Sequence, residues 1–256
     1  TRGGRQVATS AGMGMARAGL ELGGSDPAYI RADAPLESIA GDLVEACFGN
    51  AGQSCCSVER LYVHEDVYGD FMDVFIEAAR AVTVGHPVDN PGFIGPLVSR
   101  AAADRVREVI DGAVRAGARA LLPGGASPLV TGRDAYCDPC ILVDVEHGMD
   151  AVRSELFGPV ASVICVRDDD EAVQLMNDTE YGLTASIWTA DLDRAQALGR
   201  QVRSGTLYVN RCDHADINLP LGGVKQSGVG RSYGEEGLRE LTQPRAWHIR
   251  PLPGLR

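Results

Sequence analysis

Apolar side chains recur with the period of an α-helix in two long stretches of the chain. In residues 66–82, apolar positions three and four apart predict a helix whose buried face is formed by Val67, Phe71, Val74, Phe75, Ala78 and Val82. A second helix is expected after Ser99, whose hydroxyl suits an N-cap, and Gly117 is placed to end it. The positions expected to face inward in this helix are Val106, Val109, Ile110, Ala113 and Val114.

Short apolar runs alternate with the helical patterns and predict buried strands. The expected strands are residues 60–64, 160–166, 183–189 and 206–210, with a short strand and turn at 118–125. Further helices are expected at 169–178, where acidic residues lie at the N-terminus, and at 191–205. Strands and helices that alternate in this way predict the α/β class, with a largely parallel sheet and helices on its faces.

Charge and composition make several classes of function unlikely. The 256 residues are 45% hydrophobic and carry a formal net charge of −11 without a basic run, so we expect neither nucleic acid nor an anionic membrane surface as a partner. No stretch approaches about 18 consecutive apolar residues, and the first residues lack the apolar centre of a signal peptide. We therefore expect a cytoplasmic protein.

Seven cysteines occur at irregular spacing, which favours free thiols in a reducing compartment. Cys137 and Cys140 have the gap of a zinc or redox pair, but no second pair or histidine cluster follows them. Because Cys140 leads directly into the apolar run 141–145, we interpret the pair as a loop and the start of a strand, and we expect no metal site.

Cys55 and Cys56 lie in a glycine-containing loop, residues 50–56, between the apolar helix 43–48 and the strand 59–63. A cysteine becomes a nucleophile when backbone N–H groups, a helix N-terminus or positive charges stabilise its thiolate, and such a loop suits that role. A crowded pair of buried, inert thiols is the alternative.

Two carboxylates occupy positions that suit catalysis or ligand binding. Glu21 lies between leucines and before two glycines, so largely apolar surroundings are expected to raise its pKa toward neutrality and make it a general base. Glu155 and Phe157 precede a rigid Gly-Pro corner that leads into the strand at 160–166. Either glutamate could instead be a simple turn residue bonded to backbone N–H groups.

Taken in this order, the segments resemble the aldehyde dehydrogenase superfamily. Residues 20–24 (LELGG) resemble its glutamate signature, residues 52–55 (GQSC) its cysteine signature, and residues 155–159 (ELFGP) its cofactor-ribose motif. The stretches YGLTASIWT, GTLYVN and GGVKQSGVGRSYGEEGL are similar to later strands and to a Gly-rich stretch of the family. The resemblance runs the whole length of the chain, and residues 211–213 resemble a branch near the succinate-semialdehyde-type enzymes.

The resemblance implies a cysteine mechanism with NAD or NADP as the cofactor. It selects Cys55 as the nucleophile that attacks the aldehyde, with the oxyanion held by the Cys55 N–H and hydride passing to the nicotinamide to leave a thioester. Glu21 is implied to activate the water that hydrolyses this thioester, which favours a free acid over transfer to coenzyme A. Glu155 and Gly23 are implied cofactor ligands, and Phe157 is implied to pack near the nicotinamide.

The chain also departs from the family pattern, because most of the Rossmann-like cofactor domain that precedes the glutamate motif in the family is absent from this sequence. The resemblance thus implies a C-terminal portion: residues 1–23 end the cofactor-binding domain, residues 24–228 form the catalytic domain, and residues 229–256 form a C-terminal helix and an oligomerisation strand. Because the dinucleotide lies mainly on the absent domain in the family, we expect this chain alone to be a poor dehydrogenase.

The resemblance places the loop at 210–223 beside the aldehyde, with Asn210, Arg211 and His214 as substrate-pocket residues. Arg211 could anchor the anionic tail of a semialdehyde, or it could pair with Asp213 on a solvated loop. Residues 241–250 resemble the family's C-terminal strand, which adds to a neighbouring subunit's sheet, and Trp247 and Ile249 alternate with polar residues there. A homo-oligomer, dimer or tetramer, is implied for the intact enzyme.

Two other functions remain open at this point. The chain could be a non-catalytic remnant that keeps the fold and only binds other subunits. It could also be a cysteine esterase that processes activated esters without a cofactor, because a cysteine and a glutamate suffice for that chemistry.

Overall fold

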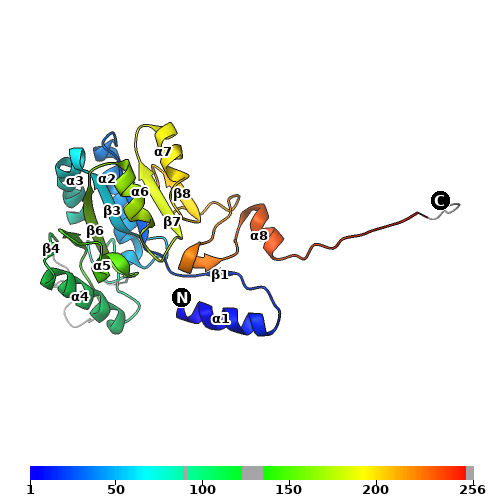
Figure 1. Cartoon of the computed structure of the whole chain (residues 1–256). Helices are drawn as coiled ribbons and strands as arrows, with labels where there is room; N and C mark the ends of the chain where they lie inside the picture. Colours follow the sequence, from blue (N-terminus) through cyan, green and yellow to red (C-terminus); the bar gives the residue numbers. More distant parts are fainter. Residues whose placement is uncertain (89–90, 123–134, 252–256) are drawn as a thin grey trace.

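A computed structural model of the chain describes residues 1–88, 91–122 and 135–251 and contains one central seven-stranded sheet (Figure 1). All neighbouring strands are parallel except β4, which is antiparallel to β5. In spatial order the strands are β4 (Arg119–Ala120), β5 (Cys140–Val143), β6 (Val160–Val166), β3 (Val58–His64), β2 (Asp26–Ile30), β7 (Thr184–Trp188) and β8 (Thr206–Val209). The α/β class and the strands expected from the apolar runs are confirmed, and the predicted turn at 123–125 lies outside the described residues.

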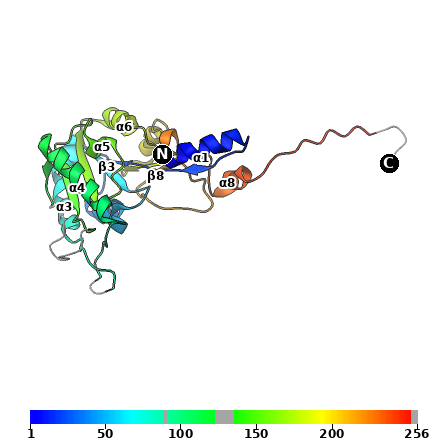
Figure 2. The same cartoon turned by 90° about the horizontal axis from the view of Figure 1, so that it is seen from below.

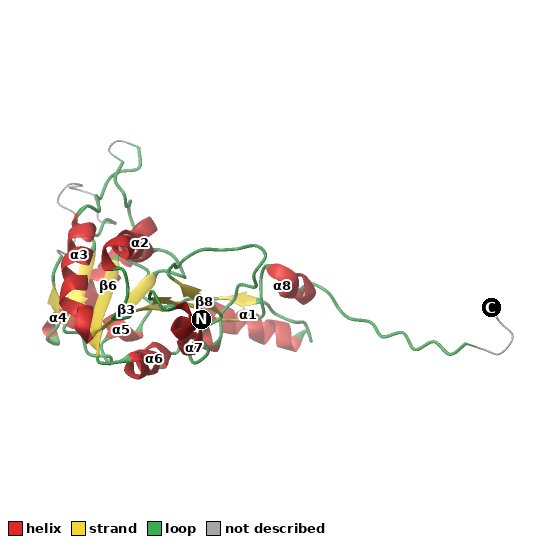
Figure 3. Ribbon diagram, turned by 90° about the horizontal axis from the view of Figure 1, so that it is seen from above, coloured by secondary structure: helices red, strands yellow, loops and turns green. Residues whose placement is uncertain are grey.

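Helices cover both faces of the sheet, and Figure 3 shows α2 and α3 on the face opposite α6 and α7. Strand residues alternate between the two cores: Ala28 and Ile30 pack into one, and Tyr29 between them packs into the other. The first core receives α2 (Leu36–Phe48), α3 (Tyr68–Arg80), α4 (Arg100–Arg115) and α5 (Asp150–Arg153). The second receives α6 (Asp169–Asn177) and α7 (Leu192–Gly199).

The helix predictions are mostly confirmed, with two corrections. The Ser99 hydroxyl accepts a hydrogen bond from the Ala102 N–H at 3.1 Å, and Gly117 follows the end of α4 with φ +113°. Val114 was wrongly predicted to face inward and is 46% exposed, because the buried face runs through Ala113 and the next residue is rotated about 100° from it. The helix predicted for 191–205 ends at Gly199, whose lack of a side chain lets Leu207 approach.

Segments from both ends of the chain meet beside the sheet. Helix α1 (Arg2–Met13) precedes β1 (Leu20–Glu21), which forms a two-stranded antiparallel sheet with β9 (Gly228–Val229). Helix α8 (Gly234–Glu240) follows, and the described residues also include the 3₁₀ turns η1 (Gly49–Gly52), η2 (Glu65–Val67) and η4 (Lys225–Ser227). Figure 2 shows α1 and α8 at this side of the molecule, away from α3 and α4.

The residues after α8 run away from the body of the molecule (Figure 1). Residues 243–251 belong to no strand in this single chain, and Trp247 is 75% exposed. The expected pairing with a neighbouring subunit therefore stays a prediction. Within the described ranges, no helix is long and apolar enough to span a membrane.

Candidate active site

The loop between α2 and β3 carries the cysteine pair, as the sequence predicted. Asn50 and Ala51 have φ of 51° and 57°, and Gly52 follows with φ +69°. A Cβ at Gly52 would clash with the carbonyl oxygen of Gly158, so the loop can lie against the 155–158 segment only with glycine here. This close approach brings the cysteine motif and the ribose motif together.

Cys55 is the exposed member of the pair and Cys56 the buried one. The two Sγ atoms lie 4.0 Å apart. The thiol of Cys56 and the backbone N–H of Cys55 lower the pKa of Cys55 to about 7, although partial burial and the carboxylates of Asp213 and Glu21 oppose this. A substantial fraction of Cys55 is therefore thiolate near neutral pH, whereas its contact with Cys55 and burial raise the pKa of Cys56.

Glu21 lies in β1, paired with β9, and its side chain is exposed. The expected apolar environment is thus wrong for this chain, because the short β1–β9 sheet lies outside the two buried cores. Its carboxylate accepts a hydrogen bond from the Ser232 hydroxyl. The Glu21 carboxylate weakly raises the pKa of Cys55, against the groups that lower it.

Glu155 joins the glutamate motif to the ribose motif. Its Oε1 accepts a hydrogen bond from the Gly24 N–H at 3.1 Å, and a Cβ at Gly23 would collide with the same carboxylate. A Cβ at Gly24 would collide with the carbonyl oxygen of Cys55. The three predicted motifs therefore meet at the two glycines that follow Leu22.

Sequence reasoning overlooked Glu59, a buried carboxylate at the start of β3. Its Oε1 accepts hydrogen bonds from the N–H groups of Leu156 and Phe157 at 2.9 and 3.0 Å. The available signal was the pair Glu59–Arg60, two charged residues inside an otherwise apolar strand. Arg60 is also buried and donates to the Ser25 carbonyl oxygen at 2.8 and 3.0 Å.

The residues present fit the ribose and nicotinamide end of a dinucleotide. The Glu155 carboxylate is only partly buried, so it can accept hydrogen bonds from hydroxyl groups in addition to the one from Gly24. Phe157 has a φ of 51° and is partly exposed, which leaves ring surface for a planar ligand. Gly23 leaves the space in which the Glu155 carboxylate sits.

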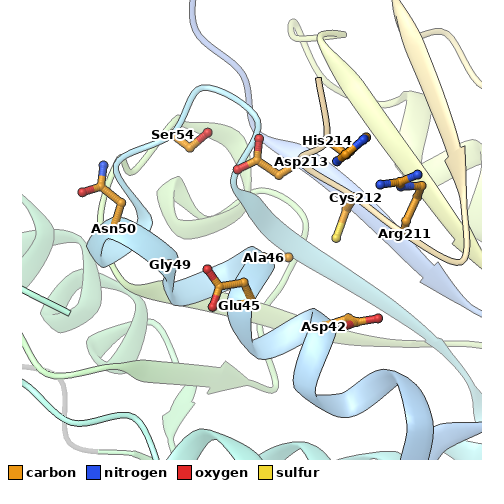
Figure 4. A pocket seen from close by; sticks show the side chains of 10 residues that line it. All are labelled: Asp42, Glu45, Ala46, Gly49, Asn50, Ser54, Arg211, Cys212, Asp213 and His214. Carbon is orange, nitrogen blue, oxygen red and sulfur yellow. The ribbon is translucent and has the colours of Figure 1, made fainter. Parts of the chain in front are cut away.

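A cavity of about 370 Å³ opens beside the cysteine loop (Figure 4). Helix α2 lines it with Asp42, Glu45 and Ala46, and the loop after β8 lines it with Arg211, Cys212, Asp213 and His214. Ser54, the neighbour of Cys55, also lines the cavity, and Figure 4 shows the Asp213 carboxylate pointing toward Ser54. Asp42, Glu45 and Cys212 are lining residues that sequence reasoning did not single out.

Of the three predicted substrate-pocket residues, Arg211 and His214 line this cavity. Asn210 does not: its side-chain amide accepts from the Thr189 N–H at 2.8 Å and donates to the Thr189 carbonyl at 2.9 Å. Asn210 thus fixes the start of the loop to the end of β7. None of the seven cysteines, all of which lie in the described ranges, forms a disulfide, and no group of His, Cys, Asp or Glu there is arranged to hold a metal ion.

Comparison with known proteins identifies a family that this chain resembles. The family model described as "Aldehyde dehydrogenase family" matches residues 1–247. A betaine aldehyde dehydrogenase from Brucella anthropi is 35% identical over 248 residues, which cover 96% of this chain and 51% of that protein.

Solved structures share the fold. An NAD-dependent aldehyde dehydrogenase from Sinorhizobium meliloti superimposes with a TM-score of 0.93 at 34% identity, covering 100% of this chain and 51% of that one. A lactaldehyde dehydrogenase from Escherichia coli gives a TM-score of 0.87 at 36% identity, with coverage of 93% and 49%. The chain thus spans about half the length of the proteins it matches.

Proposed function

The chain belongs to the aldehyde dehydrogenase family, and on that premise we propose that it carries the catalytic site of an NAD- or NADP-dependent enzyme that oxidises an aldehyde to a carboxylic acid. One observation carries the proposal. Cys55, a thiol whose pKa is lowered to about 7, lies where the glutamate, cysteine and ribose motifs converge. Packing alone does not require a nucleophile, a base and a ribose ligand at one point.

In the proposed reaction, the Cys55 thiolate attacks the carbonyl carbon of the aldehyde and forms a thiohemiacetal. The backbone N–H of Cys55 lies next to the developing oxyanion and stabilises it by a hydrogen bond. A bound nicotinamide cofactor supplies the hydride acceptor for the oxidation. Glu155 and Phe157 would hold and orient its ribose and nicotinamide end, and oxidation of the thiohemiacetal leaves Cys55 as a thioester.

Hydrolysis of the thioester is assigned to Glu21. Its carboxylate takes a proton from water, which then attacks the acyl carbon and releases the acid from Cys55. The Ser232 hydroxyl holds the carboxylate by the hydrogen bond seen in the structure. Because Glu21 is exposed, water reaches it freely in this chain.

The charge of the cavity bears on the substrate. Asp42, Glu45 and Asp213 line it, and Arg211 is the one arginine or lysine among its described lining residues. This balance favours an aldehyde that is neutral or cationic away from its carbonyl group, such as the betaine aldehyde or lactaldehyde named for the relatives. A semialdehyde held by Arg211 remains the second candidate, and rates with betaine aldehyde, lactaldehyde and succinate semialdehyde distinguish the two.

The division of the chain is part of the same proposal. Residues 1–23 would complete a cofactor-binding domain, residues 24–228 form the catalytic domain, and residues 229–256 would pair with another subunit of a homo-oligomer. Because the chain spans about half the length of its relatives, we propose that it binds NAD or NADP weakly when alone. A fluorescence titration tests this, and tight binding by the isolated chain would contradict it. Free thiols fit a reducing, cytoplasmic compartment.

An acylation experiment tests the catalytic assignment without a cofactor. p-Nitrophenyl acetate should acylate Cys55, and mass spectrometry should find the acetyl thioester there accumulating in Glu21→Gln relative to the wild type, because deacylation is slowed. Cys55→Ser should abolish the rapid acylation. Equal, slow modification of all seven thiols would favour the non-catalytic remnant. The esterase would be favoured by a different result: fast turnover of the ester, but no dehydrogenase activity even after the cofactor-binding half of a relative is added.

A further inference from the structure

Glu59 is a buried carboxylate that the proposed reaction does not use. It is 2% exposed and lies four residues after Cys55, at the point where the cysteine loop enters β3. Its Oε1 accepts both the Leu156 and the Phe157 N–H, which are nearly 100 positions away in the sequence. One oxygen therefore joins the cysteine segment to the turn that carries Glu155 and Phe157.

The turn at 155–158 depends on side chains for its shape. Phe157 adopts a φ of 51°, a left-handed conformation that is unfavourable for a residue with a side chain. The Leu156 carbonyl accepts a hydrogen bond from Arg105 on α4 at 3.3 Å. On the other side, Glu59 is the acceptor for two successive N–H groups of the turn. Without it these donors would be left buried and unpaired, a large penalty for such groups.

The second oxygen of Glu59 shows why a carboxyl group can be tolerated here. Within the described ranges, Glu59 Oε2 and the Ser25 hydroxyl oxygen are buried and make no hydrogen bond of standard geometry, but the Ser25 side chain is close enough to lower the pKa of Glu59. Burial, and more weakly the nearby charge of Glu155, raise the pKa of Glu59 to about 8, against the opposing effect of the two N–H donors. At neutral pH the group is therefore largely a neutral acid.

We propose that Glu59 is a positioning residue that fixes the Glu155–Phe157 turn against the Cys55 loop, so that the residues for the cofactor, Glu155 and Phe157, keep a constant separation from the thiol. The proposal rests on the proposed function for the meaning of that separation, but the structural link can be measured by itself. Glu59 is buried, and its Oε1 holds the turn through the N–H groups of Leu156 and Phe157.

The test compares Glu59→Gln, Glu59→Asp and Glu59→Leu in the full chain. Glutamine keeps an oxygen that can accept both N–H groups, aspartate draws the acceptor back by one methylene, and leucine removes it. Hydrogen exchange of a peptide covering residues 155–158 should match the wild type in Glu59→Gln. It should be at least about tenfold faster in Glu59→Leu and intermediate in Glu59→Asp, because each lost hydrogen bond lowers local protection.

A matched control separates this effect from a general loss of stability. Ser186→Ala removes a buried hydrogen-bond partner of the Trp188 side chain on β7, a strand whose neighbours in the sheet are β2 and β8. This substitution should leave exchange at 155–158 unchanged. The rate of Cys55 alkylation is the second readout and should stay within about twofold in all four variants, because the thiolate is stabilised locally.

Three results would overturn the positioning role: unchanged exchange in both Glu59→Leu and Glu59→Asp, fast exchange in Glu59→Gln, or equal effects on exchange and on Cys55 alkylation. Should Glu59→Leu fail to fold, Glu59→Asp against Glu59→Gln still decides the question. An unreactive Cys55 in the wild-type chain would instead refute the proposed function and leave the exchange result intact.

Discussion

Replacing Glu59 with glutamine should remove a large, pH-dependent destabilisation of the fold. Burial raises the pKa of this carboxyl from its ordinary value of 4.5 to about 8 in the folded chain. The folded state therefore binds the proton more tightly than the unfolded state does. It follows that Glu59 lowers the free energy of unfolding progressively as the pH rises from about 4.5 to about 8, and has no further effect above that range.

The size of this effect follows from the two pKa values. A pKa change of one corresponds to about 1.4 kcal/mol, so the rise from 4.5 to about 8 corresponds to about 5 kcal/mol as an upper limit. Glutamine does not titrate and can still accept the N–H groups of Leu156 and Phe157. The gain in unfolding free energy of Glu59→Gln over the wild type should therefore grow by several kcal/mol between about pH 5 and about pH 8.5.

Urea unfolding followed by circular dichroism at intervals across this pH range measures the difference. Ser186→Ala serves as the control, because its loss of a buried hydrogen bond involves no titrating group and should shift all midpoints by a similar amount. Parallel stability curves for wild type and Glu59→Gln would show that Glu59 is ionised throughout. That result would refute the assignment of a neutral, buried acid beside the ribose motif.

Two further substitutions examine the cysteine loop. Asp213→Asn removes a carboxylate that raises the pKa of Cys55, so the midpoint of Cys55 alkylation against pH should fall. The fall should be less than about one pH unit, because Asp213 is exposed. An unchanged or higher midpoint would contradict this arrangement of charges. Gly52→Ala places a Cβ against the Gly158 carbonyl at a φ of +69°, so urea unfolding should show an unfolding free energy lower by at least about 1–3 kcal/mol. In the control Gly69→Ala the new Cβ meets no other atom, and the unfolding free energy should be nearly unchanged.

Much of the fold could be predicted because buried parallel strands are encoded by short runs of apolar residues in the sequence. The run at 160–166 is apolar except for Ser162, the run at 183–189 alternates apolar with small polar residues, and both lie inside the sheet. The sequence indicates helix ends less clearly. Ser99 and Gly117 mark the ends of α4 by their own conformational preferences, but α7 ends at Gly199, well before Gly205, which the sequence favoured as the end of this helix.

The candidate site was found through its sequence motifs more than through the surroundings of its side chains. The segments that carry the glutamate, cysteine and ribose motifs meet in the structure, since Gly23 and Gly24 contact Glu155 and Cys55. The catalytic roles of Cys55 and Glu21 stay predictions. The exposure of Glu21 could not be read from its leucine neighbours, because β1 pairs with β9 more than 200 positions later. Glu59 was hidden for the same reason: its partners follow it by nearly 100 residues.

The most direct test of the central claim is the alkylation rate of each cysteine near pH 7, measured with iodoacetamide and peptide mass spectrometry. Cys165 is the internal control, because it is also exposed but partial burial and nearby carboxylates raise its pKa above the ordinary value of 9.0. With a pKa of about 7, Cys55 should react at least about fivefold faster than Cys165, once its lower intrinsic nucleophilicity is allowed for. A rate for Cys55 equal to or below that of Cys165 would contradict an activated nucleophile at this site.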